Sequence, residues 1–72
     1  MKSMTAREVN RKIEKRGGVA LRQVGSHRFY SVTANGVTAQ TTVAQHTGDM
    51  PKGILHKIQK DLEPALGKGW LE

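Results

Sequence analysis

The residues with the clearest capacity for chemistry are His27, its neighbours Arg28 and Phe29, and Arg22 a few positions earlier. RNA can be cut without a metal, because its own 2′-hydroxyl attacks the adjacent phosphorus once a base removes the proton and an acid protonates the leaving oxygen. An imidazole suits both tasks near neutral pH. An arginine can stabilise the developing phosphorane charge, and a phenylalanine can stack a base. This group of residues therefore contains the side-chain types that metal-free RNA cleavage requires, with His27 as the candidate general acid and base.

Other catalytic arrangements have weaker support. His27 could instead be a polar residue at a strand end, which is the commoner role of a lone histidine. His46 falls in an expected loop and His56 on the flank of an expected helix. The carboxylates are scattered, with no spacing that would pair them on a metal, and the chain has no cysteine for a zinc site. We therefore expect no metal and no cofactor.

Two tight-turn signals divide the middle of the chain into three strands. Gly25-Ser26 suits a type II′ turn between strands at Val19–Val24 and His27–Thr33. Asn35-Gly36 calls for a type I′ turn before a third strand. Two-residue turns fix the pairing, so we expect Val24 opposite His27, Arg22 opposite Phe29, Leu21 beside Tyr30, Val19 beside Val32, Val32 with Ala39, Tyr30 with Thr41 and Arg28 with Val43.

Side-chain alternation then gives this meander one apolar and one polar face. The expected core face carries Val19, Leu21, Tyr30, Val32, Val37, Ala39 and Val43. The opposite face carries Arg22, His27, Phe29, Ser31, Thr33, Thr38, Gln40 and Thr42. The chemistry-bearing residues His27, Arg22 and Phe29 should therefore lie together on a sheet face exposed to solvent.

A helix is expected before the strands and another after them. Thr5 and Glu8 have capping-box spacing, and Gly17-Gly18 ends the first helix. Pro51 introduces the second, which should run to about Leu62 because Pro64 prevents continuation. The apolar stripes of the helices should cover the core face of the sheet: Ala6, Val9 and Ile13 in the first, and Ile54, Leu55, Ile58 and Leu62 in the second. In the glycine-rich tail, we favour Trp70 folding back on the core over Trp70 left free for a partner.

The positive charge is concentrated in the first part of the chain. The 72 residues have a net charge of +6, and residues 1–28 hold eight lysines or arginines against two glutamates. Such a basic surface indicates a polyanionic partner, nucleic acid before membrane, although a solubilising charged helix is as good an interpretation of charge alone. We expect one domain over residues 1–72, in the cytoplasm, with no membrane segment. The predicted RNA contacts are Arg7, Arg11, Lys15, Arg22, Arg28, Phe29, Lys52 and Lys57.

These features together resemble the HicA-type mRNA interferase toxins over residues 4–62. The resemblance rests on Gly25-Ser26-His27 followed by an aromatic residue, the preceding basic helix, the loop histidine His46 and the segment from Lys52 to Leu55. It implies an α+β fold similar to double-stranded-RNA-binding domains, α-β-β-β-α, with both helices on one face of the meander. It also implies a metal-independent endoribonuclease acting on mRNA, with His27 as the catalytic residue, and a HicB-type antitoxin that covers this histidine.

Two other functions stay open at the level of the sequence. The first is a non-catalytic RNA-binding module of the same shape, in which the basic helix and the start of the second helix hold phosphates. The second is a protein-interaction domain whose basic face meets an acidic partner. RNA cleavage separates the enzyme from the first, and RNA affinity separates both from the second.

Overall fold

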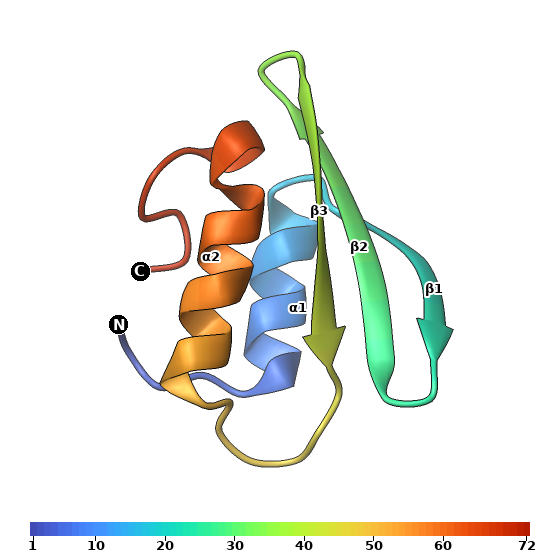
Figure 1. Cartoon of the computed structure of the whole chain (residues 1–72), viewed down its shortest axis with the longest axis vertical. Coiled ribbons are helices and arrows are strands. Elements are labelled where there is room, and N and C mark those ends of the chain that lie inside the picture. The colour runs from blue at the N-terminus through green and yellow to red at the C-terminus, as the bar shows by residue number, and fades with distance from the viewer.

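The fold is a three-stranded sheet with two helices on one of its faces. The computed structural model describes residues 1–72, with α1 at Ala6–Lys15, β1 at Val19–Val24, β2 at His27–Ala34, β3 at Val37–Ala44 and α2 at Lys52–Leu66. The sheet is antiparallel, with strand order β1-β2-β3. Figure 1 shows α1 and α2 side by side on the same side of the sheet. The expected α-β-β-β-α order and α+β class are confirmed. Neither helix is long and apolar enough to span a bilayer.

Both turns have the backbone geometry that their residues predict. Gly25 has φ of 58°, the positive value that a type II′ turn requires at its first central position. Asn35 and Gly36 have φ of 54° and 74°, as a type I′ turn requires at both central positions. The β2–β3 register follows from the second turn as expected, with pairs Val32–Ala39, Tyr30–Thr41 and Arg28–Val43.

The first hairpin departs from simple alternation halfway along β1. The pairs Val24–His27 and Arg22–Phe29 are confirmed, but Ala20 takes the place opposite Tyr30, and Val19 pairs with Ser31. Leu21 is the extra residue of a β-bulge, which shifts the residues before it by one position. The predicted pairs Leu21–Tyr30 and Val19–Val32 are therefore wrong.

The bulge and the position of β1 also change which residues form the core. Val19 and Leu21 are 60% and 50% exposed, so the prediction that they pack against the helices is wrong. β1 is an edge strand, and all six of its residues are exposed. No side chain of β1 has to be buried, so burial does not enforce a regular alternation there. Val37, at the start of β3, is 37% exposed, and Ile54 of the predicted α2 stripe is 40% exposed, so the prediction that these two residues are buried is also wrong. The core instead joins both helices to β2 and β3, where Tyr30, Val32, Ala39 and Val43 are buried as predicted.

The first helix begins and ends as its sequence indicates. The Thr5 backbone N–H donates to the Glu8 carboxylate at 3.0 Å, and the Glu8 N–H donates to the Thr5 hydroxyl at 3.2 Å. The Thr5 hydroxyl also donates to the Glu8 carboxylate, at 3.2 Å, and the two bonds from Thr5 to this carboxylate lower the pKa of Glu8. The apolar stripe of Ala6, Val9 and Ile13 is buried. A Cβ at Gly18 would clash with Ile13, so the chain needs glycine where it turns back from α1 to β1.

The second helix continues past the residue at which we expected it to stop. It runs through Pro64 to Leu66, so the prediction of an end near Leu62 is wrong. Proline lacks an N–H and disfavours a helical conformation of the residue before it. Near the last turn, however, Pro64 costs the helix only one hydrogen bond, and its ring is exposed to solvent. The helix ends at Gly67, whose N–H donates to the Glu63 carbonyl at 2.8 Å and whose φ is 93°.

The tail after α2 folds back on the core. The indole Nε1 of Trp70 donates to the Gln59 carbonyl at 2.8 Å, and the Leu71 N–H donates to the Gln59 side chain at 3.2 Å. Trp70 and Leu71 are buried. The expectation that Trp70 packs on the core is confirmed.

Candidate functional site

His27 is the first residue of β2 and lies on the face of the sheet that no helix covers. This outer face also carries Phe29, because alternate side chains of a strand share a face. The turn before His27 is held in place, since the Gln45 N–H donates to the Ser26 carbonyl at 2.6 Å. The His27 side chain is exposed and makes no hydrogen bond or ion pair within the chain. Its imidazole is therefore free to contact a bound molecule.

Arg22 and Phe29 form a stacked pair on the same outer face. The guanidinium carbon of Arg22 lies 4.4 Å from the centroid of the Phe29 ring, within the range of a cation–π contact. The two residues are direct cross-strand partners between β1 and β2. Phe29 is two residues from His27, a separation of about 6.6 Å along a strand. The structure therefore brings His27, Arg22 and Phe29 together as expected.

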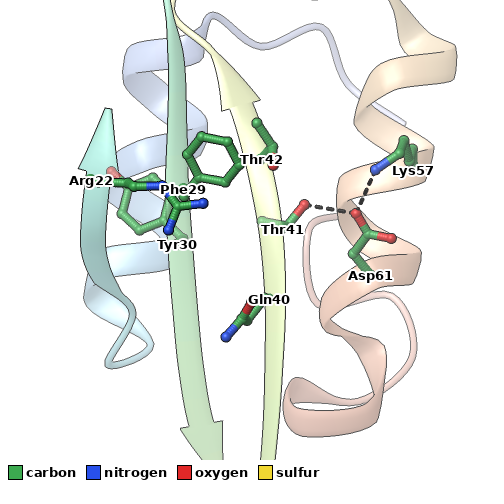
Figure 2. A pocket seen from close by; sticks show the side chains of 8 residues that line it. All are labelled: Arg22, Phe29, Tyr30, Gln40, Thr41, Thr42, Lys57 and Asp61. Carbon is green, nitrogen blue, oxygen red and sulfur yellow. Dashed lines mark hydrogen bonds and ion pairs between the residues drawn. The ribbon is translucent and has the colours of Figure 1, made fainter. Parts of the chain in front are cut away.

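A surface hollow of about 300 Å³ connects this pair to α2. Figure 2 shows Arg22 and Phe29 on one side of the hollow and Lys57 and Asp61 of α2 on the other, with β3 between them. The ammonium group of Lys57 donates to Oδ2 of Asp61 at 2.8 Å, and the Thr41 hydroxyl donates to the same oxygen at 2.9 Å. Lys57 is thus the one predicted RNA contact of α2 that lines the same hollow as the Arg22–Phe29 pair.

Arg28 does not join His27, although the two are neighbours in sequence. Its Nε donates to Gln23 at 3.0 Å and its Nη1 to the Tyr30 hydroxyl at 3.4 Å, on the face that packs against the helices. The Tyr30 hydroxyl in turn donates to Oε2 of Glu14 at 2.7 Å. Burial raises the pKa of Tyr30, the hydrogen bond from Arg28 lowers it in part, and the bond to Glu14 raises it, so that the pKa lies above its ordinary value. Arg22 is therefore the cation on the face of His27, whereas Arg28 belongs to a contact between β2 and α1.

The predicted basic residues of the helices occupy the other layer of the molecule. Arg7, Arg11 and Lys15 are exposed along α1, and Lys52 is exposed at the start of α2. Both helices start at the end of the sheet where β2 begins (Figure 1). Arg7 and Lys52 are therefore at the His27 end, whereas Lys15 is at the far end of α1. A strand of RNA in contact with all of these groups would have to pass from the outer face around an end of the sheet.

Lys15 lines a different hollow, of about 350 Å³, together with Lys12, Arg16 and Trp70. His46 lines a third, smaller hollow, of about 220 Å³, beside Met50 and Ile54. No three histidine, aspartate or glutamate side chains come together in a way that could hold a metal ion.

The sequence-based prediction did not include Gln40, Thr42 and Asp61 as lining residues of the outer hollow. A signal for them was present. Alternation already placed Gln40 and Thr42 on the face of Phe29, and Asp61 follows Lys57 by one helical turn. The sequence did not predict that α2 packs close to β3, which brings Asp61 into the same hollow as Gln40 and Thr42.

These observations define a small, strongly basic α+β domain that presents a free histidine and a cation–aromatic pair on an open sheet face. Residues 6–63 match the family described as HicA toxin of bacterial toxin–antitoxin systems. The chain therefore belongs to the HicA toxin family, and this membership implies a cognate antitoxin partner. Neither the curated proteins nor the solved structures gave a significant match.

Proposed function

We propose that this HicA-family toxin is an endoribonuclease that cuts RNA, mRNA in the cell, with His27 as general acid and base. The observation that carries the proposal is the exposed imidazole of His27 on the same open face as the Arg22–Phe29 pair. The imidazole can take the proton of a 2′-hydroxyl or deliver one to the leaving oxygen. The guanidinium of Arg22 supplies positive charge for the phosphorane.

The nucleophile belongs to the RNA in this reaction, so the protein does not have to activate a water molecule. We therefore propose that cleavage needs no metal and no other cofactor. Attack by the 2′-hydroxyl forms a bond to phosphorus and breaks the bond to the 5′-oxygen, which leaves a cyclic 2′,3′-phosphate on one fragment and a 5′-hydroxyl on the other. We further propose that the protein acts as one domain in the cytoplasm, and that a HicB-type antitoxin inhibits it by covering His27.

The end groups of the product test this proposal. RNA incubated with the protein in excess chelator should yield fragments that carry cyclic 2′,3′-phosphate and 5′-hydroxyl ends. RNA with 2′-O-methyl groups throughout should remain intact, because the nucleophile is blocked. Cleavage of the methylated RNA, or fragments with 5′-phosphate ends, would contradict the mechanism. RNA binding without cleavage would favour a non-catalytic module.

A further inference from the structure

The outer hollow carries an inference about how the substrate is held. We propose that it is a subsite for one unpaired nucleotide, whose base stacks on the Arg22–Phe29 pair while a phosphate contacts Lys57. This inference rests on the proposed RNA-cleaving function, because it places a nucleotide next to His27. It adds Gln40 and Thr42 of β3 as residues that contact the bound base.

The stacking surface is the first argument. Phe29 is half buried, and the Arg22 guanidinium lies 4.4 Å from its ring centroid. One face of the ring is therefore covered by a planar cation rather than by water. A guanidinium held on an aromatic ring has its other face available, and nucleic-acid bases stack on arginine planes as they do on aromatic rings. A base in a duplex has both faces occupied by its neighbours, so this surface selects an unpaired base.

The opposite wall supplies the charge that a phosphate needs. Two cations, Arg22 and Lys57, and one carboxylate, Asp61, line the hollow. Oδ2 of Asp61 accepts hydrogen bonds from both Lys57 and Thr41, which fixes the ammonium group beside β3. That bond uses one of the three ammonium protons, and the Lys57 side chain is 64% exposed. Lys57 can therefore contact a phosphate without losing its bond to Asp61.

Polar groups lie between the two walls. Figure 2 shows the side chains of Gln40 and Thr42 on β3, on either side of the level of Arg22. An amide and a hydroxyl each donate and accept hydrogen bonds, so they can satisfy the edge of any base. His27 does not line the hollow, but it precedes Phe29 by two residues on the same face, about 6.6 Å along the strand, so the hollow begins next to His27. The nucleotide in the hollow would thus adjoin the linkage that is cut.

Binding to an uncleavable RNA tests the subsite independently of catalysis. The probes are a short single-stranded 2′-O-methyl RNA and the same backbone without bases, which keeps every phosphate. Arg22→Lys keeps the charge but loses the planar group, and Phe29→Leu loses the ring. Each should weaken binding of the base-carrying RNA by about 5-fold or more, since stacking on one base contributes roughly 1–3 kcal/mol. Neither should change binding of the abasic RNA, which also shows that the variants are folded.

Two further variants complete the comparison. Lys57→Ala should weaken binding of both probes by the same factor, because it removes the ammonium group that meets the phosphate. Val24→Ala, on the outer face but away from the hollow, should change neither. The proposal is overturned if Arg22→Lys and Phe29→Leu bind the base-carrying RNA as the wild type does, or weaken binding of both probes by the same factor. If the wild type cleaves RNA but these variants give either of those results, the subsite is refuted and the nuclease proposal stands. If binding depends on the base but the wild type does not cleave RNA, the subsite stands and the nuclease proposal is refuted.

Discussion

The hydroxyl of Tyr30 donates a 2.7 Å hydrogen bond to Oε2 of Glu14, so the middle strand is joined to α1 by a polar contact at the border of the core. Arg28 donates to the same hydroxyl from the other side. Successive side chains of a strand point to opposite faces, so Arg28, next to His27 in sequence, lies on the face of Tyr30. A cation expected at the candidate site instead joins β2 to the contact with α1.

The Tyr30 contact predicts how stability depends on alkaline pH. Burial first, and then Glu14, raise the pKa of Tyr30 above its ordinary value. A phenol with a raised pKa in the folded state contributes stability that is fully present below the unfolded value of about 10. That contribution is lost as the pH rises through the folded pKa. Tyr30 is the only tyrosine, so the absorbance of phenolate reports it directly.

We expect the phenolate transition at higher pH in the folded protein than in the protein unfolded by denaturant. Glu14→Gln should shift the folded transition down, because it removes a negative charge next to the phenol. Glu63→Gln on α2 serves as a control for the loss of one carboxylate, because Glu63 is not among the groups that shift the pKa of Tyr30. A folded transition at or below the unfolded one would show that the hydroxyl is not buried against Glu14.

The buried tail predicts a large stability effect at the end of the chain. Trp70→Ala should lower the free energy of unfolding by about 3–5 kcal/mol, the usual cost of removing a buried tryptophan from a core. Trp70→Phe should cost less, because it keeps one aromatic ring and loses the hydrogen bond to Gln59 and the second ring of the indole. Denaturant unfolding followed by circular dichroism measures both, and the exposed Val24→Ala should stay within about 0.5 kcal/mol of the wild type. Equal effects of Trp70→Ala and Val24→Ala would mean that the tail is not part of the core.

The exposed basic residues of α1, Arg7, Arg11 and Lys15, predict RNA binding that depends on salt concentration rather than on RNA sequence. Arg11→Ala and Lys15→Ala should each weaken RNA binding by similar factors for different sequences. Each should also lower the slope of log affinity against log salt by about one for every phosphate that the variant no longer touches. Lys68→Ala in the tail is a matched control for the loss of one positive charge. An unchanged slope in both α1 variants would show that these residues do not contact phosphates and only keep this face of the helix in contact with solvent.

The turns were the most predictable part of the fold. Gly25-Ser26 and Asn35-Gly36 fix the ends of the strands by their own backbone preferences, and the β2–β3 register followed from them. Leu21 shows the limit of this reasoning, because the bulge lies in an edge strand whose two faces are both exposed. No pattern of burial distinguishes the bulged register from the regular one there.

The part of the candidate site that lies next to a turn was predicted, and the part that depends on helix packing was not. His27, Arg22 and Phe29 are within five residues of a turn, so their shared face depends on local geometry alone. The contribution of Lys57 depends on how α2 packs beside β3, and on the bond from Thr41 to Asp61. Such contacts link distant parts of the chain, and one sequence does not specify them.

The most direct test of the central claim compares RNA cleavage by wild type, His27→Ala and His56→Ala. His56 is an exposed histidine on α2, which makes it a matched control. The proteins are used at equal folded concentration, with single-stranded RNA, in chelator, from about pH 5 to about pH 9, a range that includes the ordinary histidine pKa of about 6.5.

His27→Ala should cut RNA roughly 10²–10⁴-fold more slowly, the usual cost of losing a general acid or base. It should bind RNA almost as tightly as the wild type does and unfold within about 0.5 kcal/mol of it, because His27 is exposed. His56→Ala should keep full activity. Full activity of His27→Ala, or loss of wild-type activity in chelator, would contradict the account and point to His46 or a metal ion as the source of the chemistry.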